Sequence, residues 1–244
     1  METREILLRK TIPVFVNSFN QPTYLRNLIT KLITEKFCNI NIIDNQSSNP
    51  ETLNYYKYLT QECKKVSVYY YNANMGPRYF HLSGLYKILG DVPHIYTDPD
   101  LDFDFLAIDF LSQLLDLAET YKIAKVGCAL EIPNENEIKS DLIFTPPHEN
   151  GKSFGVRDWE LQFWRNPLES DVYNAPIDTT FHLFNPKYFS LGDPLSPYLS
   201  GIRVAKKGFV MRHMPWYKDD KLPDSERNFY SKTGYEHNSW RSKL

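Results

Sequence analysis

Residues 94–103 read HIYTDPDLDF, a strand-like run that ends in a cluster of like charge. Ile95 and Tyr96 are of the residue types that are enriched in strands. Four carboxylates follow within seven residues, namely Asp98, Asp100, Asp102 and Asp104. Carboxylates this close to one another repel unless a positive group lies among them. The segment therefore predicts a strand whose end meets a lysine, a helix end or a metal ion.

Outward from this segment, strands and helices alternate through the first 130 residues. Runs of β-branched and aromatic residues predict strands at 11–19, 39–47, 65–72, 93–100 and 122–132. Apolar residues at helical spacing predict helices at 22–36, from Asn49–Pro50 to Leu59, from Leu82 to Leu89 and from Leu106 to Leu115. This alternation is typical of an α/β fold with a mostly parallel sheet and helices on both faces.

The ends of the predicted strands are polar and should lie together. They read NSFNQP at 17–22, DNQSS at 44–48, NANMGPR at 72–78 and TDPDLD at 97–102. Ligands of such sheets bind outside the carboxyl ends of the strands, so these segments predict the site. Beyond residue 133 we expect a loop, then strands within 175–189 and 201–217, and a short helix in the polar tail.

Composition excludes several classes of protein. The 244 residues are 42% hydrophobic and 24% charged, with a net charge of -2, which gives no electrostatic case for a nucleic-acid partner. The three cysteines, Cys38, Cys63 and Cys128, are widely spaced and suggest no disulfide framework. The N-terminal METREILLRK has no apolar core and no run is long enough to span a bilayer, so we expect a cytoplasmic protein without a transmembrane segment.

Two common phosphate-binding loops are missing. Residues 17–24, after the first predicted strand, contain no glycine, and NGKSFG at 150–155 lacks the upstream glycine of a P-loop. A divalent metal held by the acidic strand end would neutralise a phosphate instead. Asp98 and Asp100 are two apart in an extended segment, so both carboxylates can face one ligand. The alternative is a turn at Asp98–Pro99, with Asp102 or Asp104 capping the next helix.

The ordered set of motifs resembles a family 2-type glycosyltransferase of the GT-A fold, as found in bacterial and viral surface-polysaccharide synthesis. The motifs are VFVNSFNQPTYLRNLI, IIDNQSS, NMGPR, YTDPD as the DxD element, APIDTTFHLF and HMPWY, within residues 12–217. The resemblance implies a Rossmann-like, mostly parallel sheet flanked by helices. It also implies a single domain over residues 1–244, with a nucleotide-binding half at 1–132 and a mixed acceptor half at 133–244.

The resemblance also implies roles for individual residues. The nucleotide-sugar donor, a UDP-, GDP- or dTDP-sugar, would contact Asn17, Ser18, Phe19, Asp44, Arg78 and Asp98. Mn²⁺ or Mg²⁺ would bind Asp100 and His213, and Trp216 would lie under a sugar ring. Each has a plainer alternative: Asn17, Ser18 and Asn20 as caps of the first helix, Asp44 in a turn, Arg78 on the surface and His213 packed in the core.

For catalysis, the resemblance points to Asp178 as the base that takes the proton from the acceptor hydroxyl. Glu131 is the second candidate, and a bond from Asp178 to the backbone of Thr179 or Thr180 is the structural alternative. We expect inverting transfer, although a retaining enzyme would need no such base. The Gln-x-x-Arg-Trp motif of processive members is missing, which favours one non-processive transfer to a glycan or lipid-linked acceptor and leaves peripheral membrane contact open.

Two other functions remain as alternatives. A sugar-phosphate nucleotidyltransferase would share the general architecture, but NSFNQP does not correspond to its Gly-rich, Arg-containing loop. A sugar-binding protein without turnover would keep the fold alone. Release of pyrophosphate would indicate the nucleotidyltransferase, and any hydrolysis or transfer would exclude the binding protein.

Overall fold

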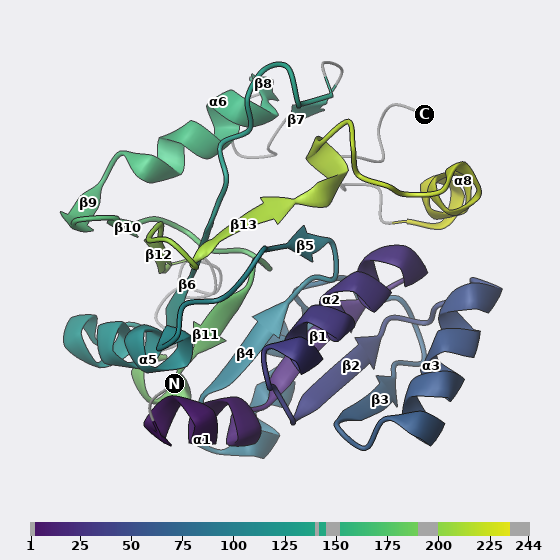
Figure 1. Ribbon diagram of the computed structural model, residues 1–244, viewed down its shortest axis with the longest axis horizontal. Helices are drawn as coiled ribbons and strands as arrows, with labels where there is room; N and C mark the ends of the chain where they lie inside the picture. Colours follow the sequence, from purple (N-terminus) through teal and green to yellow (C-terminus); the bar gives the residue numbers. More distant parts are fainter. Residues whose placement is uncertain (1–2, 140–141, 145–151, 190–199, 235–244) are drawn as a thin grey trace.

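The computed structural model describes residues 3–139, 142–144, 152–189 and 200–234, and a twisted sheet runs through both halves of the chain (Figure 1). Its first four strands are parallel, in the order β3-β2-β1-β4. Their bounds are β1 (Val14–Ser18), β2 (Ile40–Asp44), β3 (Val66–Tyr70) and β4 (His94–Thr97). The strands predicted at 11–19, 39–47, 65–72 and 93–100 are therefore confirmed.

The second half of the chain extends the same sheet in mixed orientation. The order continues from β4 as β11-β6-β12-β10-β9. The bounds are β6 (Lys125–Leu130), β9 (Pro167–Glu169), β10 (Val172–Asn174), β11 (His182–Phe184) and β12 (Ile202–Val204). β11 is antiparallel to both β4 and β6, whereas β12 is parallel to β6. The predicted α/β class with a mostly parallel sheet and a mixed second half is confirmed.

Four helices pack against one face of this sheet, namely α1 (Thr3–Thr11), α2 (Pro22–Thr34), α3 (Pro50–Glu62) and α5 (Phe110–Tyr121). The opposite face, which carries Phe15 and Tyr96, is covered by the short segments α4 (Tyr79–Leu82) and η1 (Leu85–Leu89). α2 and α3 each begin at a proline, and Asn49 caps α3 by accepting from the amides of Glu51 and Thr52. One hydrophobic cluster extends from Val14 in β1 to Val204 in β12, so the two halves share a core.

Two predicted helices differ from the structure. The helix expected from Leu82 to Leu89 is instead α4 (Tyr79–Leu82) and the short 3-10 turn η1 (Leu85–Leu89). Gly84 lies between them at φ 76°, in the left-handed region that ends a helix. The helix expected from Leu106 begins only at Phe110, because residues 103–109 form a loop.

Most of the remaining elements lie at the carboxyl ends of the parallel strands (Figure 1). β5 (Leu101–Asp102) pairs with β13 (Val210–His213), which also joins β6. The others are β7 (Ile143–Phe144), β8 (Phe154–Gly155), α6 (Val156–Leu161), η2 (Gln162–Trp164), η3 (Pro186–Tyr188), η4 (Met214–Trp216) and α8 (Asp224–Thr233). η3 is the exception, because it follows the antiparallel strand β11 and so lies near the amino ends of β4 and β6. α8 is the helix predicted in the tail, of which residues 235–244 lie outside the described part.

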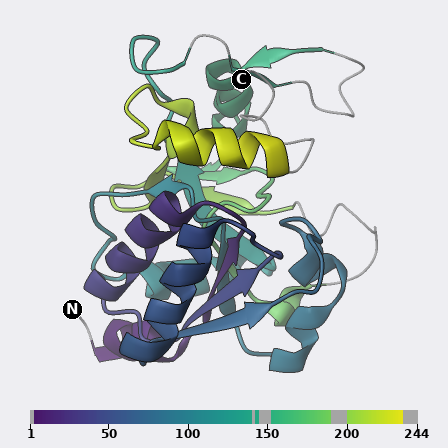
Figure 2. The same ribbon diagram turned by 90° about the vertical axis from the view of Figure 1, so that its right-hand side faces the viewer.

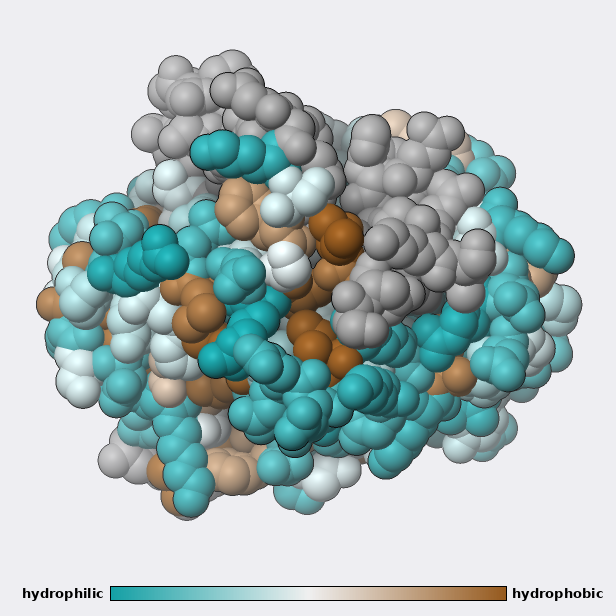
Figure 3. All heavy atoms as spheres, turned by 90° about the horizontal axis from the view of Figure 1, so that it is seen from above, coloured by the Kyte–Doolittle hydropathy of each residue, from teal (hydrophilic) through white to brown (hydrophobic). Residues whose placement is uncertain are grey.

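α8 lies above α2 and α3 (Figure 2). Seen from above, the face of the molecule is mostly hydrophilic, with hydrophobic residues near its centre (Figure 3). Among the described residues, we find no helix with the length and apolar character needed to span a membrane.

Candidate active site

The side chain of Asp98 links the two halves of the chain. The antiparallel pairing of β11 with β4 brings Thr179 alongside it. Asn17 Nδ2 donates to Asp98 Oδ1 at 3.1 Å, and Thr179 Oγ1 donates to Oδ2. The Asp98 amide donates to the Thr179 carbonyl at 3.0 Å. Burial, and then the charge of Asp100, hold the pKa of Asp98 well above its ordinary value, although both side-chain hydrogen bonds lower it.

Asp100 and His213, the two predicted metal ligands, lie next to each other. β5 follows Asp100 directly, and its antiparallel pairing with β13 sets Leu101 opposite His213. His213 Nε2 lies 3.4 Å from Asp100 Oδ2. Asp100 Oδ1 and His213 Nδ1 are buried and have no hydrogen-bond partner within the described ranges. A buried carboxylate oxygen without a partner is unfavourable, so a positive group bound at Asp100 Oδ1 would stabilise this pair.

The donor set fits a divalent cation. A carboxylate oxygen and an imidazole nitrogen are both common metal ligands, and the imidazole favours manganese over magnesium. The parts of the chain that the structure describes contain no group of three or more His, Cys, Asp or Glu side chains arranged to hold a metal ion. A cation at Asp100 and His213 would therefore take its other ligands from water and substrate oxygens, as Mg²⁺ commonly does.

The remaining carboxylates of the acidic segment have different partners. Asp102 forms an ion pair with Lys31 of α2 and accepts a hydrogen bond from Asn27 Nδ2 at 3.0 Å. Asp104 is exposed. Neither caps α5, so that alternative is wrong; Glu5 of α1 accepts from the first-turn amides of α5 instead. Lys31 thus balances the charge of Asp102, whereas among the described residues Asp100 has His213 and no lysine or arginine as an ion-pair partner.

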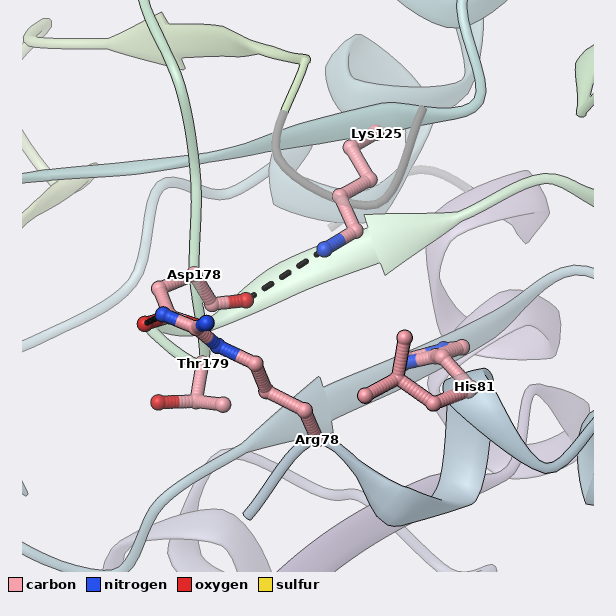
Figure 4. Close-up of a pocket in the computed structure, with 6 residues that line it drawn as sticks. Arg78, His81, Lys125, Asp178 and Thr179 are labelled. Carbon is pink, nitrogen blue, oxygen red and sulfur yellow. Dashed lines mark hydrogen bonds and ion pairs between the residues drawn. The ribbon is translucent and has the colours of Figure 1, made fainter. Parts of the chain in front are cut away.

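Arg78 and Asp178, the predicted diphosphate contact and the predicted base, bind each other (Figure 4). Arg78 Nε donates to Asp178 Oδ1 at 2.5 Å, and Arg78 Nη2 donates to Oδ2. The two side chains are 46% and 45% exposed, respectively. Arg78 comes from the turn after β3, and Asp178 from the segment before β11, so the pair joins the two halves of the chain.

Lys125 lies next to Asp178, and its amino group points toward the Asp178 backbone (Figure 4). It is the first residue of β6 and is buried, and its Nζ donates to the carbonyls of Ile177 at 3.2 Å and Asp178 at 3.3 Å. Burial lowers the pKa of Lys125 to about 8, Asp178 raises it, and Arg78 lowers it. Lys125 therefore fixes the backbone at Asp178 from the inside of the fold.

Three buried histidines pack behind Lys125. His81 Nε2 lies 3.3 Å from His94 Nε2, and the rings of His81 and His182 are 5.8 Å apart. Burial lowers the pKa of His94 to about 4, and burial with the charge of Lys125 holds the pKa values of His81 and His182 well below 6.5. All three rings are therefore neutral near pH 7.

The loop after β1 is organised mainly by contacts within the fold. Asn17 accepts from Asn45 Nδ2 as well as donating to Asp98. Ser18 is buried, with its Oγ 2.9 Å from the Tyr56 hydroxyl. Phe19 packs edge-on against Tyr230 of α8. Contact of Asn17, Ser18 and Phe19 with a nucleotide stays a prediction.

Capping of the first helix by this loop is wrong. Gln21 stands at the start of α2 and makes no side-chain cap. The carboxylate of Glu226, from α8, accepts from the Thr23 amide at 3.2 Å and from its hydroxyl at 2.6 Å. Asn20, at φ 52°, instead accepts from the amides of Ser48 and Asn49.

Asp44 uses its carboxylate in its own turn. The Ser47 amide donates to Asp44 Oδ2 at 3.0 Å, and the Tyr56 hydroxyl donates to Oδ1 at 2.8 Å. The turn that the sequence offered as the alternative is therefore present, and a bond from Asp44 to a nucleotide base stays a prediction. Burial, and then the charge of Asp44, raise the pKa of Tyr56.

Glu131 and Trp216 flank the metal-ligand pair. Glu131 Oε2 lies 3.7 Å from Arg212 Nε, and burial raises the pKa of Glu131 although Arg212 lowers it. The Trp216 ring lies 4.5 Å from His213, centroid to centroid, and is buried. Trp216 thus supports His213; contact with a sugar ring stays a prediction.

Sequence reasoning missed several residues of this region. Thr179 lies within the APIDTTF motif, yet nothing local indicated its bond to Asp98. Lys125 looks like an ordinary charged residue at a strand start. Glu160 and Arg203 form a buried ion pair behind β6 and β12, and burial raises the pKa of Glu160 to about 7 while Arg203 lowers it. Their separation in the sequence conceals the pairing.

Comparison with known proteins identifies the fold alone. No protein-family model and no curated protein matches the sequence. Among solved structures, GalNAc-T7 with UDP, GalNAc and Mn²⁺ is 13% identical with a TM-score of 0.52, covering 84% of this chain and 44% of that one. The mannosyltransferase PcManGT from Pyrobaculum calidifontis with GDP-Man and Mn²⁺ is 10% identical with a TM-score of 0.54, covering 94% of this chain and 62% of that one.

The chain therefore has a GT-A-like glycosyltransferase fold and spans less than two thirds of the length of either structure. A putative glucose-1-phosphate thymidylyltransferase from Bacillus anthracis in complex with a sucrose also matches, at 12% identity and a TM-score of 0.42, covering 92% of this chain and 84% of that one. A score this low adds nothing to the choice between functions.

Proposed function

We propose that the protein is a metal-dependent glycosyltransferase that moves one sugar from a nucleotide-sugar to an acceptor hydroxyl. One observation carries this proposal: Asp100 and His213 meet at the carboxyl end of β4, with a buried carboxylate oxygen that has no partner in the described ranges. Two solved structures of similar fold contain Mn²⁺ together with UDP or GDP-mannose, and this supports the same function. We further propose family 2 membership and a role in surface-polysaccharide synthesis.

Each residue near the acidic strand end has a proposed task. Asp100 and His213 hold the cation, and Asp98 binds the ribose or sugar of the donor while Asn17 and Thr179 fix its orientation. When bound, the divalent cation would offset the negative charge that grows on the leaving diphosphate. Arg78 adds a second positive group for the diphosphate, because its planar fork matches two phosphate oxygens.

The transfer needs a base opposite the leaving diphosphate. The acceptor oxygen forms a bond to the anomeric carbon as the bond from that carbon to the diphosphate breaks, and the electron pair of that bond goes to the diphosphate. The hydroxyl proton passes to the Asp178 carboxylate, and attack on the face opposite the diphosphate inverts the anomeric carbon. Glu131, half-buried beside Arg212, is the second candidate for the base. The acceptor would be a glycan or a lipid-linked sugar, extended by one unit.

A thermal-shift panel of UDP, GDP, CMP and dTDP, with and without Mn²⁺, tests this function. We expect one nucleotide to raise Tm by several degrees only when Mn²⁺ is present, since a ligand at 100 times its Kd adds about 2.7 kcal/mol of stability. Asp100→Asn should remove the metal-dependent shift. Asp104→Asn makes the same charge change at an exposed position of the same segment and should keep it.

Two results would contradict the proposal. A shift with Mn²⁺ that Asp100→Asn leaves intact would exclude Asp100 as a ligand. No shift with any nucleotide would remove the donor-binding function altogether, and Tm values without ligand would show that each variant is folded.

A further inference from the structure

Resting on the proposed function, we propose that Arg78 keeps Asp178 unavailable until the donor binds. In the described structure both oxygens of the Asp178 carboxylate accept hydrogen bonds from the Arg78 guanidinium. The donor diphosphate requires the same guanidinium, so its binding exchanges one anion for another and releases the carboxylate. The base is thereby assembled only when a donor is in place.

The pair is built so that this exchange can occur. Both side chains are nearly half exposed, so opening the pair moves two solvated groups and disturbs no core packing. Arg78 comes from the turn after β3, which belongs to the nucleotide-binding half, and Asp178 precedes β11 in the other half. A guanidinium binds carboxylate and phosphate through the same two-pronged geometry, so the two anions compete directly.

The backbone around Asp178 is fixed independently of Arg78. Lys125 Nζ donates to the carbonyls of Ile177 and Asp178, and Thr179 is bound to Asp98 through both its side chain and its carbonyl. Departure of the guanidinium would therefore free the carboxylate without moving the chain that carries it. Lys125 acts here as a positioning residue.

The space next to the pair is too small for a phosphate while the pair is closed. The cavity there has a volume of about 10 Å³ and is lined by Arg78, His81, Leu82, Lys125, Asp178 and Thr179. This is about the space of one water molecule. A diphosphate that enters on this inner side of Arg78 must therefore do so as the pair opens, which couples the two events.

This coupling predicts a result opposite to that of an ordinary active-site substitution. Since Asp178 competes with the diphosphate for Arg78, Asp178→Asn should tighten the binding of the nucleoside diphosphate by about two- to fivefold, the scale expected for an exposed ion pair. Arg78→Met should weaken binding. In the Arg78→Met background, Asp178→Asn should have little further effect, because no competition is left to relieve.

The experiment is a double-mutant cycle measured by calorimetric titration of UDP and of GDP, each with Mn²⁺. The four proteins are the wild type, Asp178→Asn, Arg78→Met and the double variant. Asp116→Asn, which removes the charge of another exposed aspartate paired with an arginine, controls for net charge. If Arg78→Met does not fold, Arg78→Lys replaces it, because lysine keeps the charge and loses the fork.

The outcomes separate this inference from the function on which it rests. If the wild type binds neither nucleotide, the proposed function fails and the inference fails with it. If the wild type binds and Asp178→Asn does not tighten binding, the inference alone is overturned. Equal tightening in the wild-type and Arg78→Met backgrounds would also overturn it, since that would be a charge effect through space.

Discussion

Glu5 and Arg9 are buried charged residues in a segment that looks like an exposed terminus. Arg9 Nε donates to Glu5 Oε1 at 2.8 Å, and its Nη1 donates to Glu35 Oε2 at 2.6 Å. Glu5 in turn accepts from the amides of Leu111 at 3.1 Å and Ser112 at 2.9 Å. The sequence METREILLRK shows the spacing of Glu5 and Arg9, but their other partners lie just after α2 and in α5, which no local pattern reveals.

Arg9→Met should therefore destabilise the protein by about 3 kcal/mol or more, because it leaves Glu5 buried with one charge partner fewer. The free energy of unfolding from urea denaturation, at unchanged m value, measures this effect. Arg4→Met removes an arginine of the same helix whose pair with Asp116 is 52% and 61% exposed, and should cost less than about 1 kcal/mol. Equal losses in both variants would contradict the assignment of Arg9 as a buried partner.

At the scale of single residues, the sequence indicated which residues lie near one another better than it indicated the partners of each. Asp98 and Asp100, two residues apart, have different surroundings: Asp98 accepts two side-chain hydrogen bonds, and Asp100 has one oxygen without a partner among the described residues. Asp44 is bound by Tyr56 and Arg78 binds Asp178, and both contacts form only when the chain is folded.

Elements with strong local signals were predicted well. Proline at the first turn and a capping asparagine identified α3, and apolar spacing identified α2 and α5. The apolar spacing wrongly predicted one continuous helix across Gly84, whose left-handed backbone separates α4 from η1. The sequence placed the start of α2 at Pro22 correctly but missed its cap, which comes from Glu226 in α8, because a cap supplied by a distant helix leaves no local pattern.

Glu226→Ala should loosen the start of α2. Loss of the acceptor for the Thr23 amide and hydroxyl should cost about 1–2 kcal/mol, the usual range for a helix cap. Amide hydrogen exchange should become faster at residues 23–25. Asp224→Ala removes an exposed acid from the first turn of α8 and should leave exchange in α2 unchanged. Unchanged exchange in both variants would mean that α8 does not hold α2.

For the whole molecule, alternation of strands and helices predicted the parallel part of the sheet, and polar strand ends predicted where the site lies. The position of β11 between β4 and β6 could not be predicted. Its three residues pair with strands that are distant in the sequence, and so short a segment does not indicate which strands it pairs with or in which direction it runs. That strand nevertheless brings Thr179 and Asp178 to the acidic strand end. The proposed acceptor side of the site therefore depends on the least predictable part of the sheet.

The same strand helps bury the histidine cluster, which should make stability depend on pH. The pKa of His94 is lowered to about 4 by burial, against an ordinary value of 6.5. Near pH 7 the ring is neutral in the folded and unfolded states, so it adds no pH dependence. As pH falls below 6.5, His94 becomes protonated in the unfolded chain, whereas in the folded protein it stays neutral until about pH 4. This one group should cost about 3 kcal/mol of stability across that window.

Urea denaturation from pH 7 to pH 4.5 measures this dependence. In His94→Phe the new ring would lie among Phe15, Phe80 and Phe184. The free energy of unfolding should fall less steeply with decreasing pH than in the wild type, and the difference in slope should correspond to close to one proton taken up on unfolding. Phe15→Leu lowers stability within the same cluster without removing a titrating group, so its curve should run parallel to that of the wild type. A His94→Phe curve that is also parallel would show that His94 takes up its proton in the folded state, and that the cluster is open to acid.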